Sequence, residues 1–198
     1  NCGVGSKDKK NDVKKNLKIV IKKICKKSKE IFLVKQTHSN KFLFLSKNTK
    51  IKNRSITADA IITDKKDFPI AVLTADCVPI LLFDKKRKMI AAIHAGWRGA
   101  FKGVISKVIN FMLKKGCDRK DIIVAIGPSI TQKNYNVKLD FKNKFIKKHK
   151  KNKIFFKNRN KLIYFDLPNF IKSQLKFNKI SKIDMINIDT YDKKNNFF

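Results

Sequence analysis

The chain has 198 residues, a length that suits one domain with a sizeable core. Apolar residues make up 42% of it, which excludes an intrinsically disordered chain. The formal charge of +33 by itself favours a nucleic-acid partner, but only five of the 48 basic residues are Arg, the residue best suited to bidentate contact with phosphates and bases. Because the lysines are spread from Lys7 to Lys194, we interpret the charge as a Lys-rich solvated surface and expect no specific nucleic-acid partner.

Cysteine spacing and hydropathy indicate the compartment. The four cysteines are widely spaced and include no CxxC pair, which argues against a disulfide framework. The apolar runs at 70–73 and 78–83 are far shorter than the ~20 residues that span a bilayer. We therefore expect a cytoplasmic protein without a membrane partner. We expect one domain, 1–198. Because no Met begins the chain and it stops abruptly at 195–198, we expect this domain to be truncated at both ends.

The first elements are read from apolar spacing. Residues 9–30 carry apolar positions at helical intervals with Lys on the remaining face, which predicts a surface helix. Short apolar runs at 31–34 and 42–45 predict strands on either side of the polar turn 36–40.

Between residues 56 and 127 Lys thins out and β-branched runs alternate with turn signals, so we expect the chemical centre of the chain here. Buried strands are predicted at 60–63, 70–74, 78–84, 89–94 and 122–126, with a charged hairpin connection at 84–88. The apolar face of 100–115 predicts a helix that ends at Gly116. Farther on we expect a Lys-rich helix around 137–150, a strand at 163–165, a helix at 167–175 and a last strand at 185–188.

Three histidines occur, and two of them lie where Lys is scarce. His149 lies in a run of lysines whose positive field disfavours a cation, so we interpret it as a solvated surface residue. His38 occupies the polar turn, His94 ends a buried strand, and Cys77 lies at a break between two strands. Taken alone, each is better explained as a structural residue, a buried small hydrophobe or a hydrogen-bonded histidine. Together, two imidazoles and one thiolate suit Zn²⁺ or copper, and three ligands leave a position open for water or substrate.

Glycines cluster directly after the strand that ends in the second histidine. Gly96, Gly99 and Gly103 suit a strand that turns at once into a helix, whose exposed amides and dipole would favour an anion. Arg98 could add a bidentate clamp for phosphate. Spacing alone leaves open the alternative that the glycines only allow tight packing while Trp97 fills the core.

Several segments resemble one known family. The segments TADCVPI at 74–80 and HAGWRG at 94–99 resemble the two signature segments of the bacterial polyphenol oxidases, or laccases, now regarded as purine nucleoside phosphorylases. QTH at 36–38 is similar to the family's first histidine motif, and ADA at 58–60 to its acidic segment. Weaker similarities occur at 1–3, 126–128, 165–168, 190–191 and 197–198, so the likeness covers essentially the whole chain. Relatives often carry cysteines where this chain has Ser129 and Asp189.

The resemblance implies a fold and a function. The fold is α/β (α+β), a single domain of mixed β-sheets with helices packed on the outside. A zinc ion, or alternatively copper, is expected on His38, Cys77 and His94. The expected activity is phosphorolysis of adenosine, inosine and S-methyl-5'-thioadenosine, with adenosine deaminase activity beside it. Purine nucleosides and phosphate are thus the expected partners.

The residues suggest roles in this chemistry. Arg98, with Gly96 and Gly99, would bind phosphate as it attacks the ribose C1′. Cys77 belongs to the catalytic centre, and Asp76 beside it is a candidate proton carrier or orienting residue. The alternatives are a copper-dependent polyphenol oxidase, for which three histidines are few, a hydrolase with the cysteine as nucleophile, and a basic nucleic-acid-binding module. The oligomeric state and the preferred nucleoside stay open.

Overall fold

The computed structural model describes residues 1–3, 5–195 and 197, so Phe198, part of the family-like ending, lies outside them. Within these residues nine strands form two sheets. The larger sheet contains, in spatial order, β1 (Phe42–Leu45), β2 (Ala60–Thr63), β4 (Ile90–Ala95), β3 (Val78–Asp84), β5 (Ile122–Ile126) and β9 (Lys182–Met185). The outer pairs, β1 with β2 and β5 with β9, are parallel, and the inner pairs are antiparallel. The expected mixed sheet is therefore confirmed.

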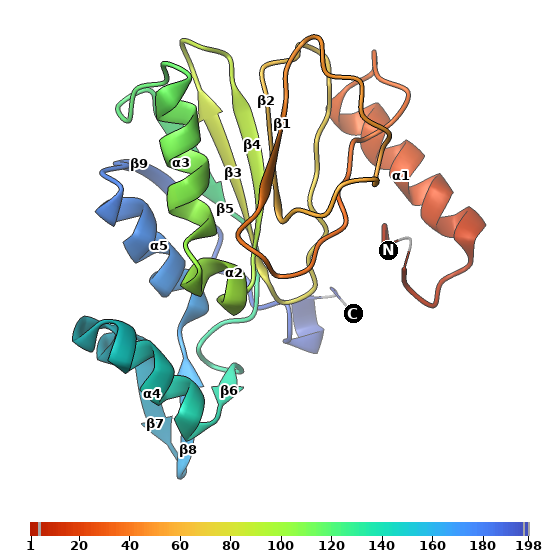
Figure 1. Cartoon of the computed structure of the whole chain (residues 1–198). Coiled ribbons are helices and arrows are strands. Elements are labelled where there is room, and N and C mark those ends of the chain that lie inside the picture. The colour runs from red at the N-terminus through yellow and green to blue at the C-terminus, as the bar shows by residue number, and fades with distance from the viewer. Residues whose placement is uncertain (4, 196, 198) are drawn as a thin grey trace.

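Helices cover the larger sheet unequally. Their bounds are α1 (Lys10–Ile24), α2 (Trp97–Phe101), α3 (Val104–Lys114), α4 (Leu139–Lys148) and α5 (Leu167–Phe177), with short 3₁₀ helices η1 (Lys150–Phe155) and η2 (Lys193–Asn195). Figure 1 shows α3 and α5 together on one side of the sheet and α1 beside its other side. Five apolar residues of α3 recur on one face and are buried, which places the main core between this helix and the sheet: Val104, Ile105, Val108, Ile109 and Met112. No helix in the described part of the chain is long and apolar enough to cross a membrane.

A smaller sheet and α4 form an aromatic extension of this core. The strands β6 (Asn136–Val137), β8 (Leu162–Phe165) and β7 (Phe156–Arg159) pair antiparallel in that order, and β6 and β7 were not predicted from the sequence. Phe145 of α4 is fully buried. Its ring centroid lies 4.7 Å from that of Phe141 and 4.8 Å from that of Phe165. Aromatic contacts therefore join the small sheet to the rest of the molecule.

Two predicted strands are absent from the named strands of the described residues. The segments 31–34 and 70–74 are apolar, but they form only one isolated bridge, Phe32 with Ile70, and a second bridge, Lys35 with Thr57, lies just after the first segment. Side chains satisfy much of their backbone instead. Asn53 accepts from the Leu33 amide and donates to the Ile31 carbonyl, both at 2.8 Å. The strand prediction is wrong here because an apolar run does not reveal where its backbone hydrogen bonds go.

Two boundaries also differ from the sequence prediction. The helix expected at 100–115 is divided into α2 and α3, because Gly103 adopts φ +82°, a left-handed conformation that interrupts helical hydrogen bonding. Gly116, with φ +85°, ends α3 as expected. The last strand lies at 182–185 and not at 185–188, because residues 182–185 pair with β5, while Ile186 and Ile188 remain exposed.

The aromatic extension predicts one large stability effect. Phe145→Ala should lower the free energy of unfolding by about 3–5 kcal/mol, because it removes a fully buried ring and leaves a cavity. Phe177→Ala is the matched control, since that ring is 87% exposed and its loss should change stability by no more than about 0.5 kcal/mol. Urea unfolding followed by circular dichroism measures both. Similar losses in the two variants would contradict a core centred on Phe145.

Candidate metal centre and cleft

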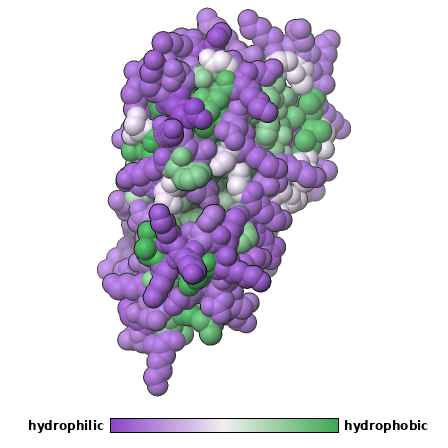
Figure 2. All heavy atoms as spheres, turned by 60° about the vertical axis from the view of Figure 1, so that its left-hand side comes forward, coloured by the Kyte–Doolittle hydropathy of each residue, from purple (hydrophilic) through white to green (hydrophobic). Residues whose placement is uncertain are grey.

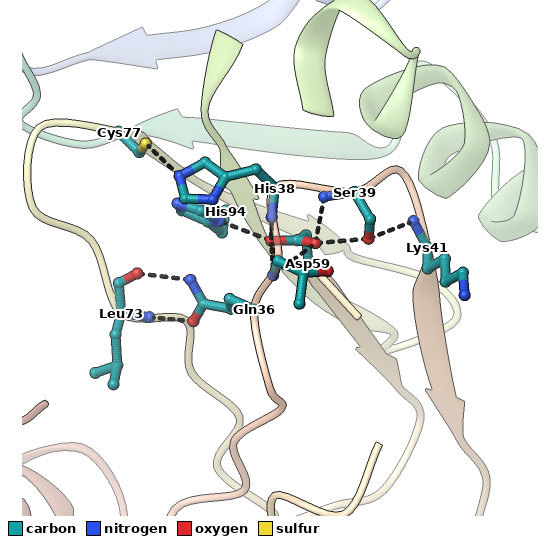
Figure 3. A network of polar contacts seen from close by, with 9 residues as sticks. Gln36, His38, Ser39, Lys41, Asp59, Leu73, Cys77 and His94 are labelled. Carbon is teal, nitrogen blue, oxygen red and sulfur yellow. Dashed lines mark hydrogen bonds and ion pairs between the residues drawn. The ribbon is translucent and has the colours of Figure 1, made fainter. Parts of the chain in front are cut away.

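The three predicted metal ligands come together although they lie far apart in the sequence. His38 extends from the turn before β1, Cys77 directly precedes β3, and His94 lies near the end of β4. Their ligand atoms all lie within 4.8 Å of one another, and His38 Nε2 is 3.6 Å from Cys77 Sγ (Figure 3). Among the described residues this is the one group of three or more His, Cys, Asp or Glu side chains close enough to hold a metal ion.

The donor set and its spacing suit one metal ion. Zn²⁺ bonds to imidazole and thiolate are ~2.0–2.3 Å long, which in a tetrahedral site separates the ligand atoms by about 3.5 Å. The observed separations of 3.6 Å and up to 4.8 Å therefore require only a small closure. Three protein ligands leave one tetrahedral position for substrate or water. His149, in contrast, is exposed at the end of α4.

A buried carboxylate organises this cluster. Asp59 is fully buried and accepts hydrogen bonds from the backbone amides of Thr37, His38 and Ser39 at 3.1, 2.9 and 2.6 Å. The Ser39 hydroxyl donates a further bond at 2.6 Å. Three consecutive amides thus converge on one carboxylate, and the turn adopts φ +57° at His38. Burial alone would raise the pKa of Asp59, but hydrogen bonds from Ser39, His94 and Thr37 outweigh it and hold the pKa below its usual value.

The same carboxylate fixes one of the ligands. His94 Nδ1 lies 2.9 Å from Asp59 Oδ1, so Nδ1 carries the hydrogen and Nε2 keeps its lone pair for a metal. Burial lowers the pKa of His94 and outweighs the hydrogen bond to Asp59, which favours the neutral ring. Sequence reasoning missed this role of Asp59. The available signal was an acidic residue between two alanines at the start of a fully buried strand.

Cys77 suits a metal ligand better than a free nucleophile. Burial raises the pKa of its thiol to about 11, and the negative charges of Asp76 and Asp59 act in the same direction. A nucleophilic cysteine needs the opposite, a pKa lowered by nearby positive charge. A divalent cation bound to the sulfur would instead favour the deprotonated thiolate. The loop that carries Cys77 is held at Leu73, whose amide and carbonyl bond the Gln36 side chain at 2.8 and 2.7 Å.

The glycines after β4 provide space for the cluster. A Cβ on Gly96 would lie 2.7 Å from His38 Cδ2 and 2.8 Å from Cys77 Sγ. A Cβ on Gly99 would lie 2.8 Å from the Ser39 carbonyl oxygen. Both glycines therefore allow the segment after β4 to press against the His38 turn. The predicted contact of their amides with phosphate stays a prediction, and α2, which follows, spans only five residues.

A cleft of about 250 Å³ opens beside the cluster. Its lining is formed by His38, Asp76, Cys77, Trp97, Arg98, Ile130, Tyr135 and Leu167. Arg98 is exposed and, among the described residues, has no carboxylate within ion-pair distance. Its guanidinium carbon lies 5.3 Å from the centre of the Trp97 ring. The cleft thus combines a free cation, apolar walls and two of the three ligand residues, His38 and Cys77.

Asp76 and Tyr135 add polar groups to this cleft. Asp76 adopts φ +72°, and its Oδ1 accepts from the Thr190 hydroxyl at 2.9 Å. The contact that orients the ligand His94 is made by Asp59 and not by Asp76. A proton-carrying role for Asp76 stays a prediction. Burial raises the pKa of Tyr135 to about 12, with smaller effects from Cys77 and Asp76, which keeps its hydroxyl protonated. Tyr135 was not predicted from the sequence, because it lies in a loop outside the segments that resemble the family.

The positions at which relatives often have cysteines lie side by side. Ser129 and Asp189 form an isolated parallel bridge. Asp189 accepts hydrogen bonds from the Thr131 hydroxyl, from Asn134 Nδ2 at 2.9 Å and from the Tyr191 amide at 3.0 Å. This network fastens the C-terminal segment to the loop after β5, and both segments reach Asp76 through hydrogen bonds. The wall of the cleft is therefore held by polar contacts.

Comparison with known proteins identifies the family. Residues 1–198 match the family described as "Multi-copper polyphenol oxidoreductase laccase". The chain belongs to this family. A purine nucleoside phosphorylase of Rickettsia prowazekii is 35% identical over 167 residues, which cover 83% of this chain and 68% of that protein. A purine nucleoside phosphorylase of Bacteroides thetaiotaomicron is 33% identical over 144 residues, covering 69% of this chain and 53% of that protein.

Solved structures show the same fold. The hypothetical protein YfiH of Bacillus licheniformis has a TM-score of 0.85 at 22% identity, covering 96% of this chain and 75% of the other. YlmD from Geobacillus stearothermophilus has a TM-score of 0.83 at 20% identity, with 98% and 76% covered. The predicted family and fold class are both confirmed.

The clearance at Gly96 yields a prediction about metal affinity. Gly96→Ala should weaken metal binding by at least about tenfold, because the new methyl group would displace His38 or Cys77. Gly5→Ala is the control, since no atom lies within 4 Å of its Cβ position. Competition with a chromogenic zinc chelator measures the affinity, and thermal unfolding checks the fold. Unchanged affinity in a folded Gly96→Ala protein would mean that the cluster does not bind the metal.

Proposed function

We propose that this protein is a metal-dependent purine nucleoside phosphorylase that acts on adenosine, inosine and S-methyl-5'-thioadenosine with phosphate, and that also deaminates adenosine. The observation that carries the proposal is a cleft that Arg98 lines together with His38 and Cys77, two members of the His-Cys-His cluster. The names of the relatives, purine nucleoside phosphorylases at about 35% identity, support the same reaction. A cytoplasmic location is part of the proposal.

Each group in the cleft suits one part of phosphorolysis. A phosphate oxygen forms a bond to the ribose C1′ while the bond from C1′ to the purine nitrogen breaks, giving ribose 1-phosphate and the free base. Arg98 would hold the phosphate by paired N–H donors, which supplies proximity and neutralises charge. Trp97, Ile130 and Leu167 offer apolar surface to the purine. Asp76 or Tyr135 would pass a proton to the departing base.

Zinc is the metal that the donor set favours. His38, Cys77 and His94 supply two imidazoles and one thiolate with an open position, which is the pattern of catalytic zinc sites. When bound, the metal supplies a fixed positive charge that polarises a substrate oxygen or a water, as deamination requires. Copper binds similar ligands, but a multicopper oxidase needs further clusters, and the described residues hold one.

One product analysis tests the proposal. The metal-analysed protein is incubated with adenosine, with and without phosphate, and the products are separated by chromatography. We expect ribose 1-phosphate and adenine with phosphate, and slow formation of inosine and ammonia without it. His38→Ala, Cys77→Ala and His94→Ala should each lose bound zinc and most activity, because a three-ligand site does not survive loss of one ligand.

A substitution of the remaining histidine is the control for that experiment. His149→Ala should keep zinc and activity, since this ring is exposed and outside the cleft. Full zinc occupancy in Cys77→Ala would overturn the ligand assignment. If the zinc-loaded protein forms no ribose 1-phosphate and the copper-loaded protein oxidises phenols, the proposed phosphorylase activity is wrong and the protein is a phenol oxidase.

Arg98 separates the two proposed reactions, because phosphorolysis needs an anion and deamination needs only water. Arg98→Ala should slow phosphorolysis by about ten- to a thousandfold, the effect of losing a charge-assisted contact of ~1.5–4 kcal/mol. Deamination should fall much less. Arg98→Lys should restore part of the rate, since an ammonium returns the charge without the planar grip. The readouts are the initial rates and the apparent phosphate affinity.

The contact with Trp97 supplies the competing explanation for Arg98. If the guanidinium only braced that ring, Arg98→Ala would reduce both reactions and the melting temperature together. Equal losses with an unchanged phosphate affinity would exclude Arg98 as the phosphate ligand.

A further inference from the structure

A second concave surface lies outside the cleft and shares no lining residue with it. This groove has a volume of about 710 Å³ and lies where η1 and α5 meet the junction of α2 and α3. One face of α5 lines it, through Phe170, Ser173, Gln174 and Phe177. These residues follow the i, i+3, i+4, i+7 spacing of a single helical face, which is therefore left without a covering element at its C-terminal end.

Large apolar side chains project from this groove. Phe177, on α5, is 87% exposed, and Ile154, on η1, is 76% exposed. Phe101, Phe155 and Phe170 continue the apolar lining inward. Figure 2, which turns the left-hand side of Figure 1 forward, shows apolar patches set among hydrophilic residues. Exposed apolar groups rimmed by polar ones are typical of surfaces that bind another protein.

The charge around the groove selects the partner. Lys148, Lys150 and Lys151 line one wall, and no Asp or Glu occurs in the described lining. Lys148 is held in place, because its ammonium donates to the Phe101 carbonyl and lies 4.2 Å from the centre of that ring. A second copy of this chain, at +33, would be repelled. A partner therefore needs acidic residues around an apolar stripe.

The walls of the groove also indicate which secondary structure a bound partner would have. They belong to helices and to the turns between them, and no strand edge is available in the described lining for pairing with an extended peptide. An apolar groove between helices accepts an amphipathic helix by its i, i+3, i+4 and i+7 side chains.

We propose that this groove is a docking site for an acidic amphipathic helix of a partner protein. The site is independent of the phosphorylase reaction, since the residues of the cleft are not involved. The apolar stripe of the partner would cover Phe177 and Ile154, and its flanking carboxylates would face the lysines. Burial of the two exposed side chains supplies most of the affinity, and the charges supply specificity.

The test uses a labelled synthetic helix of about 15 residues, with Leu at i, i+3, i+4 and i+7 and Glu at most other positions. Fluorescence anisotropy with the full chain at about 0.15 M salt should give saturable binding. The double variant Phe177→Asp/Ile154→Asp should weaken binding by about tenfold or more. The matched control is Leu81→Asp, which alters an exposed apolar residue on β3, away from the groove, and should leave binding unchanged. Circular dichroism verifies that each variant is folded.

Three outcomes would overturn the proposal. Equal binding of a peptide with Ser in place of every Leu would reduce the interaction to general attraction by a basic chain. Equal loss in Leu81→Asp would move the interaction away from the groove. Binding to vesicles of anionic phospholipid that depends on Phe177 and Ile154, with no saturable peptide binding, would identify a lipid surface as the occupant instead.

Discussion

The site depends on one buried carboxylate. Asp59 is fully buried, yet it remains charged because three backbone amides, a hydroxyl and an imidazole donate to it. The same bonds hold His38 in a left-handed conformation and fix the tautomer of His94. Two ligands from different segments are thereby oriented by a single group. An unsatisfied carboxylate in this position would cost several kcal/mol, so the turn and the strand must be in place together.

The register of the larger sheet places the third ligand, Cys77, beside His94. In the pairing of β3 with β4, Pro79 lies opposite His94 and Val78 opposite Ala95. Cys77 therefore lies just before the start of β3, next to the end of β4 that carries the histidine. Gly96 then allows the chain to pass close to both His38 and Cys77. One ligand, His94, is therefore held by a central strand, Cys77 lies directly before another, and the turn of His38 is fixed by its bonds to Asp59, which suits a centre that has to keep a fixed geometry.

Local patterns predicted much of this arrangement, and the failures have a common cause. The bounds of β3, the apolar face of α3 and the stop at Gly116 follow from nearest neighbours along the chain, and the structure agrees with them. Motif resemblance brought His38, Cys77 and His94 together. The segments 31–34 and 70–74 were misassigned because their backbones bond to the side chains of Asn53 and Gln36, which no local pattern reveals. The orienting role of Asp59 was missed for the same reason, since its partner His94 is 35 residues away.

The charges around the cluster favour a cation there, even in so basic a chain. Asp59 is buried beside a neutral His94, and Asp76 lies next to Cys77, so negative charge is concentrated where the ligand atoms meet. A divalent cation on the two imidazoles and the sulfur would stabilise the thiolate and, through the His94 ring, compensate Asp59. The surrounding lysines create a field that favours anions. Within the cleft, the guanidinium of Arg98 has no carboxylate within ion-pair distance among the described residues, so its positive charge is left free for the anion that the proposed reaction requires.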